Sequence, residues 1–167
     1  MTFEIAVARP EDAEALGEIH AEAWLVAYRP FFDAEFFERA VARRRGQWHA
    51  IVAEGVDSVL VACHEGRPRA FSRFGPSRDR PGWGEVWGFY GHPASWGTGI
   101  AAALMAATVS RMADDGFASA HLWTLRDTPQ SRRFYRKAGF EESGASRRYD
   151  FGEGRFVDQV EYHRPAP

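Results

Sequence analysis

The stretch HPASWGTGIAAALM, from His92 to Met105, combines a proline turn, two glycines and an unbroken apolar run. The apolar run predicts a helix that begins near Gly97 and extends to Asp115. The start of a helix leaves four backbone N–H groups unpaired and carries a partial positive charge. Because glycine has no Cβ, an anion can approach these N–H groups closely. The stretch therefore predicts a helix whose first turn is open to an anion.

Strand-like and helix-like segments alternate on both sides of this helix. Strands are predicted over residues 2–8, 58–63, 69–75, 85–90 and 119–125, with a closing pair at 147–151 and 155–163. Further helices are predicted over 10–27, from Asp33 as N-cap toward Trp48, and over 129–139. HEGRP (residues 64–68) predicts a hairpin turn. This order favours one α/β (α+β layered) domain over residues 1–167, with a single mixed, mostly antiparallel sheet and helices on both faces. The strand–helix–strand unit in the middle requires a parallel pair.

Composition excludes several classes of protein. The 167 residues are 45% hydrophobic with a formal net charge of -2, so the chain has no basic surface for nucleic acid. The N-terminal segment carries acidic residues and no long apolar run, which argues against a signal peptide or a membrane span and favours the cytoplasm. The single cysteine, Cys63, lies in an apolar strand-like run. None of the six histidines forms a metal-binding spacing, so no metal is expected.

The glycine stretch alone leaves alternatives open. GTGIAA (residues 97–102) fits a dinucleotide fingerprint only with Ala102 in the last place. That site also needs an acidic residue at the end of the next strand, and Asp127 comes about ten residues too late. A P-loop needs Gly-Lys-Ser/Thr, which is absent. A glycine-rich turn that binds no ligand remains a further interpretation.

Two segments together are more specific. EVWGFYGHPASWGTGIAAALM (residues 85–105) and HLWTLRDTPQSRRFYRKAGFEESG (residues 121–144) resemble the GNAT superfamily of acetyl-CoA-dependent N-acetyltransferases. The likeness extends to the opening segment IAVARPEDAEALGEIHAEAW and covers nearly the whole chain. It implies that the strand at 85–90 splays from its parallel neighbour, and that acetyl-CoA is the cosubstrate.

The resemblance assigns the cofactor contacts. The coenzyme A pyrophosphate would lie against the loop and first helical turn, formed by Trp96, Gly97, Thr98, Gly99, Ile100, Ala101 and Ala102. Trp96 stands where the family often has Arg or Gln, so we expect it to pack over the turn instead of supplying charge. Main-chain groups of Phe89, Tyr90 and Gly91 would hold the pantetheine arm. Thr128, where many members have Asn, is expected to cap the helix at Pro129, with a cofactor contact as the alternative.

The chemistry of acetyl transfer assigns the catalytic groups by the same resemblance. The N–H of Phe89 would stabilise the oxyanion of the tetrahedral intermediate. Tyr135, beside the cofactor thiol, would act as general acid on the leaving thiolate, since a phenol has a pKa of about 10. Glu85 lies on the same strand face as Phe89 and would serve as base through water, while bulk solvent is the alternative base.

The acceptor is the least specified part. Trp24 and Tyr28 are i, i+4 neighbours on one helix, and Phe32 follows. They would form an aromatic wall for an amine, with core packing as the alternative, and Arg73 would receive a carboxylate or lie in solvent. We expect transfer of an acetyl group to a primary amine of a small molecule. Acetylation of a protein or peptide N-terminus, a non-catalytic acyl-CoA-binding module, and a homodimeric assembly stay open.

Overall fold

The computed structural model describes residues 1–165, which form seven strands, five α-helices and three short 3-10 helices. The strands make one sheet in the order β1-β2-β3-β4-β5-β7-β6. The chain divides into two compact units. The first consists of Met1–Phe74 and Gly88–Thr108, and the second of Gly75–Trp87 and Val109–Pro167. β3 (Arg67–Pro76), β4 (Gly84–Gly91) and α4 (Ile100–Asp114) contribute residues to both.

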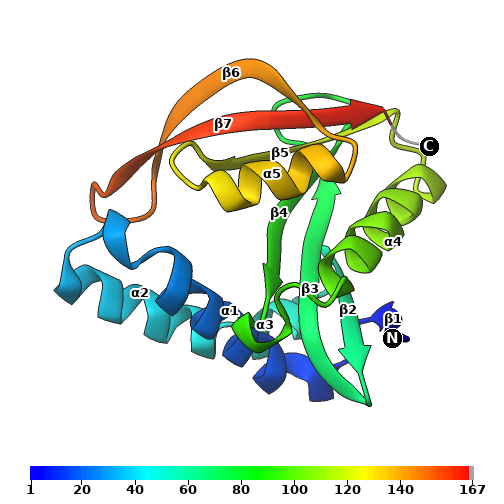
Figure 1. Cartoon of the computed structure of the whole chain (residues 1–167), viewed down its shortest axis with the longest axis horizontal. Coiled ribbons are helices and arrows are strands. Elements are labelled where there is room, and N and C mark those ends of the chain that lie inside the picture. The colour runs from blue at the N-terminus through cyan, green and yellow to red at the C-terminus, as the bar shows by residue number, and fades with distance from the viewer. Residues whose placement is uncertain (166–167) are drawn as a thin grey trace. The chain divides into compact units, whose positions relative to one another are not determined.

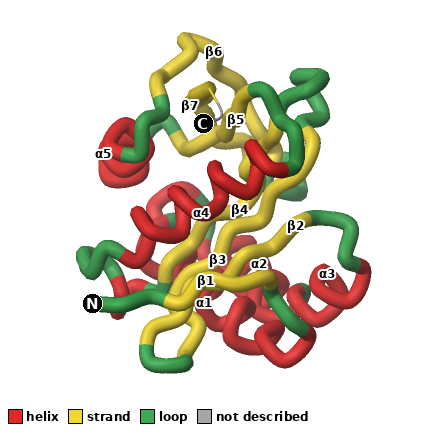
Figure 2. The backbone as a smooth tube through the Cα atoms, turned by 90° about the vertical axis from the view of Figure 1, so that its right-hand side faces the viewer, coloured by secondary structure: helices red, strands yellow, loops and turns green. Residues whose placement is uncertain are grey.

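The first unit holds the N-terminal helices. It contains β1 (Glu4–Val7), α1 (Ala13–Ala27), α2 (Ala34–Gly46), α3 (Trp48–Glu54) and β2 (Ser58–His64). β1 pairs antiparallel with β2, and β2 pairs antiparallel with β3. The β2–β3 turn is confirmed at Glu65 and Gly66, which have φ angles of +51° and +74°. Figure 2 shows α1, α2 and α3 gathered beside β1, β2 and β3.

Alternate residues of β3 face opposite sides of the sheet, because successive side chains of a strand alternate. Phe71 packs into a core cluster that includes Leu16 and Ile19 of α1. Its neighbour Ser72 points the other way, where its Oγ lies 2.7 Å from Oγ1 of Thr108 in α4. Helices therefore cover both faces of the sheet, as the sequence predicts.

Helices α1 and α2 approach each other at the level of their backbones. A Cβ on Gly17 of α1 would collide with the carbonyl oxygen of Arg45 in α2. The predicted N-cap is confirmed, since the Asp33 side chain accepts a hydrogen bond from the Phe36 N–H at 2.9 Å. The helix predicted from Asp33 toward Trp48 ends at Gly46, and a separate helix α3, which was not predicted, follows. The chain breaks at Gln47, and Trp48 begins α3 with only 1% of its surface exposed.

The second unit contains the rest of the sheet. β5 (Ser119–Leu125) is followed by α5 (Pro129–Lys137), β6 (Glu141–Asp150) and β7 (Phe156–Pro165). β7 runs between β5 and β6 and is antiparallel to both (Figure 1). β4 and β5 are parallel, and over residues 1–165 their ladder is confined to Gly84, Glu85 and Val86 with Ala120, His121 and Leu122. This short ladder confirms the predicted parallel pair inside a mostly antiparallel sheet.

Two glycines of the second unit show how closely its elements pack. A Cβ on Gly84 would lie 2.8 Å from the Met112 Cε and 3.0 Å from the Phe117 ring. Gly139 ends α5 with a φ of +89°, which confirms the predicted helix stop. The predicted cap at Thr128 is wrong, because its hydroxyl donates to the Leu125 carbonyl at 2.8 Å and makes no side-chain cap bond.

Candidate functional site

The loop between β4 and α4 presents backbone N–H groups. It passes through a 3-10 turn (Pro93–Ser95) and then through Gly97 and Gly99, whose φ angles are +78° and +91°. L residues rarely adopt such angles, so the sequence needs glycine at both places. Over residues 1–165, the N–H groups of Gly97, Gly99, Ala101 and Ala102 have no backbone or side-chain acceptor. Consecutive amides in a loop of this kind, together with a helix N-terminus, form an anion-binding concavity.

The space beside Gly97 and Gly99, where an anion would bind, is open. A Cβ on Gly97 would meet nothing within 4 Å, and one on Gly99 would meet a single atom, Cε2 of Phe3, at 4.0 Å. Both glycines are exposed, and Thr98 between them is half-buried. In the first turn of α4, Ile100 is buried, Ala101 is half-buried and Ala102 is exposed, so the turn is accessible at Ala101 and Ala102.

Trp96 takes the place where the family often carries a cation. Its indole N–H donates to the Gly91 carbonyl at 2.9 Å, and its ring lies 3.7 Å from the position of a Cβ on Gly91. The side chain is 39% exposed. Trp96 packs over the turn, as predicted, and links the loop to the last residue of β4.

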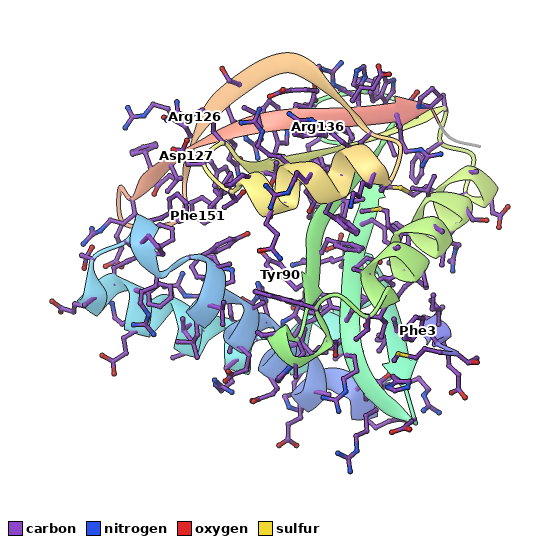
Figure 3. The ribbon with its side chains drawn as sticks, in the orientation of Figure 1. Phe3, Tyr90, Arg126, Asp127, Arg136 and Phe151 are labelled. Carbon is purple, nitrogen blue, oxygen red and sulfur yellow. The ribbon has the colours of Figure 1, made fainter. Side chains whose placement is uncertain are left out.

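The end of β4 places Phe89, Tyr90 and Gly91 immediately before this loop, and all three are half-buried. Strand alternation puts Phe89 on one face and Tyr90 on the other. The Tyr90 side chain reaches toward α1, where its ring centroid lies 4.4 Å from that of His20 (Figure 3). The family resemblance assigns only main-chain contacts to Tyr90, so this side-chain contact adds to its expected role.

Two polar groups of neighbouring aromatic side chains lie near the Tyr90 hydroxyl. The Trp24 indole N–H and the Tyr28 hydroxyl each lie 3.5 Å from it. Phe32 stacks on Trp24 with ring centroids 5.5 Å apart. Trp24 is only 1% exposed and belongs to the core, so it cannot itself form an exposed wall. Tyr28 and Phe32 are half-buried and present the accessible part of this aromatic cluster.

His20 lies beneath the aromatic cluster as a neutral imidazole. The Trp48 indole N–H donates to its Nδ1 at 3.1 Å, so Nε2 carries the proton. Burial, together with the positive charges of Arg44 and Arg73, lowers the pKa of His20 to about 3. Arg73 is itself paired, because its guanidinium lies 2.6 Å from the Asp57 carboxylate. The suggested carboxylate-receiving role of Arg73 therefore competes with an existing ion pair.

Glu85, the suggested base, lies in the second unit and is 6% exposed. The β4–β5 register places it beside His121, whose Nε2 is 3.5 Å from Glu85 Oε1. The Ser77 hydroxyl is 3.5 Å from the same oxygen and 2.6 Å from His121 Nε2. On the other side of the ring, His121 Nδ1 lies 2.9 Å from Glu161 Oε2. Glu85 is thus part of a buried polar cluster.

Glu161 is held firmly as a carboxylate. The Arg80 guanidinium donates to both its oxygens, at 2.5 and 2.9 Å, and the Ser143 hydroxyl donates at 2.6 Å. Burial alone would raise the pKa of Glu161, but these hydrogen bonds and charges hold it below the usual range. A lasting negative charge therefore lies next to His121 Nδ1.

Tyr135, the suggested general acid, lies on α5 in the second unit and is half-buried. Its ring makes edge contacts with Phe134 and Phe140, at centroid distances of 5.4 and 6.2 Å, and lies 6.0 Å from Tyr162. Because these rings fix the ring plane of Tyr135, the phenol oxygen has a defined direction. The hydroxyl of Thr128, in the turn before α5, bonds within that turn, while the Thr128 carbonyl accepts from the Arg132 N–H of the helix at 3.2 Å.

Sequence reasoning missed Ser77, His121, Glu161 and the side chain of Tyr90. One signal was available for His121, because it is a polar residue in a strand that is otherwise buried. Ser77 and Glu161 lie 84 residues apart and carry no motif. Within residues 1–165 no group of three or more His, Cys, Asp and Glu has metal-site geometry, and no helix has the length and apolar character to cross a membrane.

A central strand that leads through a glycine-rich loop into a helix, in a mixed sheet with one parallel pair, defines an α/β protein with a candidate anion site at a helix N-terminus. A model of the acetyltransferase (GNAT) family matches residues 14–140, so the chain belongs to this family and is an acyltransferase. No curated protein sequence matches the chain significantly.

Solved structures share the fold. The PaiA N-acetyltransferase of Thermoplasma acidophilum, in complex with coenzyme A, has a TM-score of 0.75 at 20% identity over 96% of this chain and 98% of its own. YncA of Salmonella typhimurium, with its cofactor acetyl-CoA, has a TM-score of 0.72 at 21% identity over 100% and 95%. The ribosomal-protein-alanine N-acetyltransferase of Brucella melitensis has a TM-score of 0.73 at 22% identity over 97% and 99%.

Proposed function

We propose that the protein transfers an acetyl group from acetyl-CoA to a primary amine of a small molecule. The observation that carries this proposal is the loop at Gly97 and Gly99, whose backbone N–H groups have no acceptor within residues 1–165 and whose Cβ positions are open at the start of α4. The similar structures with bound coenzyme A and acetyl-CoA support this donor. The pyrophosphate of the donor is the anion that the loop accepts, each charge contact contributing about 0.3–1 kcal/mol.

The reaction is a direct attack of the amine on the thioester. The amine nitrogen forms a bond to the carbonyl carbon, and the oxyanion is stabilised by the N–H of Phe89. The C–S bond then breaks, and the phenol of Tyr135 gives its proton to the sulfur. The proton lost by the amine goes to Glu85, through water because Glu85 is buried. Thr128 has its hydroxyl engaged in its own turn, so we give it no part in binding.

For the acceptor we propose the aromatic cluster of Tyr28, Phe32 and Tyr90. Two hydroxyl groups and three partly exposed rings provide an apolar surface with polar tips. Aromatic faces also attract cations by about 0.5–2 kcal/mol, which favours an amine-bearing molecule. The Brucella protein acts on a ribosomal protein, so a peptide N-terminus is the second candidate acceptor.

The experiment is a release assay for free coenzyme A thiol with a panel of amines. The panel contains amino acids, polyamines, aromatic amines and short peptides with free N-termini. Thiol release with small amines supports the proposal, while release with peptides alone would move the acceptor to the second candidate. If acetyl-CoA raises the melting temperature but no amine releases thiol, the transferase assignment is refuted in favour of a binding module. NAD(H), tested in parallel, should leave the melting temperature unchanged.

A further inference from the structure

The second unit buries a polar cluster that the proposed reaction uses only through Glu85. Its members come from four segments of the chain, and the side chains of three of them are almost completely inaccessible: Glu85 at 7%, His121 at 0% and Glu161 at 1% exposure. Ser77 completes the cluster from the loop after β3. Burying two carboxylates is costly unless they are paired, so this cluster calls for an explanation.

The hydrogen bonds around Ser77 fix where its proton points. Its oxygen accepts from the backbone N–H groups of Asp79 and Arg80, at 3.2 and 3.0 Å. A hydroxyl has two lone pairs and one proton, so the proton remains for His121 Nε2 at 2.6 Å. His121 Nε2 is therefore an acceptor, and its Nδ1 carries the hydrogen that binds Glu161 at 2.9 Å. With both lone pairs engaged, Ser77 is placed as a link and not as a nucleophile.

The charged groups around His121 carry a net negative charge that one proton would neutralise. Three carboxylates, of Glu85, Glu161 and Asp79, face two guanidinium groups. Arg80 binds Glu161, and Arg147 lies 3.9 Å from Asp79. The other titratable group near the ring is His163, which stacks on Trp83 as part of the same wall. With His121 neutral the five charged groups sum to one negative charge, so a single added proton makes the cluster neutral.

We propose that His121 is a positioning residue that shares one proton with Glu85, so that the base of the reaction is the Glu85–His121 pair. This rests on the proposed function, in which Glu85 takes the amine proton. Glu85 Oε1 receives that proton; the proton is then held either on this oxygen or, by transfer along the 3.5 Å contact, on His121 Nε2. Glu161, fixed by Arg80, stabilises the resulting imidazolium. The proton leaves to solvent before the next turnover.

Two carboxylates lie on either side of one imidazole, so the negative charge of Glu85 attracts a proton on His121. The consequence has a definite sign. Removing the charge of Glu85 must lower the pH at which His121 becomes protonated. Removing His121 must move the acid limb of the pH–rate profile to lower pH, because Glu85 then binds its proton alone.

The test combines a spectrum and a rate. Imidazole 15N spectra of the wild type and of Glu85→Gln report the titration of His121 directly and need no acceptor. We expect the Nδ1–H form at high pH, and a titration midpoint that falls in Glu85→Gln. In the thiol-release assay, His121→Gln should lower kcat/KM by about tenfold or more, below the 10²- to 10⁴-fold of a removed base. The acid limb of the pH–rate profile of His121→Gln should move to lower pH, while the affinity of this variant for acetyl-CoA stays unchanged.

His163→Gln is the matched control, because His163 is paired with His121 in the β5–β7 register and stacks on the same Trp83. It should keep the wild-type profile. Ser77→Ala provides a second variant that changes a partly exposed residue, should His121→Gln fail to fold. The inference is overturned if the titration midpoint of His121 is equal in the wild type and in Glu85→Gln. It is also overturned if the acid limb of the pH–rate profile lies at the same pH in His121→Gln as in the wild type. If the wild type acetylates no amine, the proposed function fails, and the spectra distinguish this from failure of the shared proton.

Discussion

Replacing Gly99 by Asp tests whether the loop before α4 binds the phosphates of the donor. Gly99 has a φ of +91°, and its Cβ position meets one atom at 4.0 Å, so a side chain fits without a collision. The change adds one negative charge beside the open N–H groups. Gly99→Asn is the matched control, because Asn and Asp tolerate positive φ and cap helices equally well. The difference between the two variants therefore isolates the charge.

The magnitude follows from Coulomb's law. A carboxylate about 6 Å from one phosphate charge, at an effective dielectric constant of about 20, is repelled by about 2.8 kcal/mol. Since 1.4 kcal/mol corresponds to about tenfold, Gly99→Asp should bind acetyl-CoA about 100-fold more weakly than Gly99→Asn. Both variants should lose a similar unfolding free energy, about 1–2 kcal/mol, from the backbone conformation.

The assay is titration calorimetry with acetyl-CoA, at low ionic strength and again near 1 M salt. The difference should shrink in high salt, where the Debye length is about 3 Å. Acetyl-pantetheine, which lacks the pyrophosphate, should be used equally by both variants. Equal affinity of the two variants for acetyl-CoA at low salt would refute the phosphate assignment of this loop.

Three further predictions concern the amine, the acid and pH. Tyr135→Phe should lower kcat by about 10²- to 10⁴-fold with unchanged acetyl-CoA affinity, measured with any accepted amine. A change of only a few-fold would make Tyr135 a packing residue. Tyr28→Ala should raise the KM for the amine and leave acetyl-CoA affinity nearly unchanged; the exposed Val26→Ala on the same helix is its control. His20 stays neutral down to about pH 3, whereas its unfolded form is protonated below about 6.5. The unfolding free energy should therefore fall by about 2 kcal/mol more between pH 7 and 5 than in His20→Asn, whose amide oxygen can accept from Trp48. Urea unfolding at pH 7 and pH 5 measures this change in both proteins. Equal losses of unfolding free energy in the wild type and in His20→Asn would contradict the buried neutral form of His20.

Local features of the fold could be predicted from the sequence. The β2–β3 turn and the Asp33 cap depend on residues within three or four positions of each other, and both are confirmed. The break between α2 and α3 was not predicted, although residues 42–47 read ARRRGQ and interrupt the apolar pattern with a glycine. Trp48 follows the break and packs against His20 in the core. Low helix propensity at Gly46 and the packing of Trp48 act together there.

The same distinction applies to the candidate site. The glycine loop was predictable because its residues are contiguous and its conformation requires glycine at two positions. The cluster around His121 was not, because it joins residues 77, 85, 121 and 161 through one parallel and one antiparallel register. A one-residue slip in either register would turn its side chains to the other face, and composition does not fix that register.

The loop from Gly91 to Ile100 is held in its conformation by its own hydrogen bonds. The Ala94 N–H binds His92 Nδ1, the Thr98 hydroxyl binds the Ser95 carbonyl, and the Trp96 indole binds the Gly91 carbonyl. The conformational entropy of this segment is therefore lost during folding and not during binding. A loop that is already ordered gives up little freedom when it receives a ligand, so a binding site without a loop cation can still hold an anion tightly. We expect the ordering of the loop by Trp96 to compensate, in the free energy of anion binding, for the charge contact that a tryptophan cannot make.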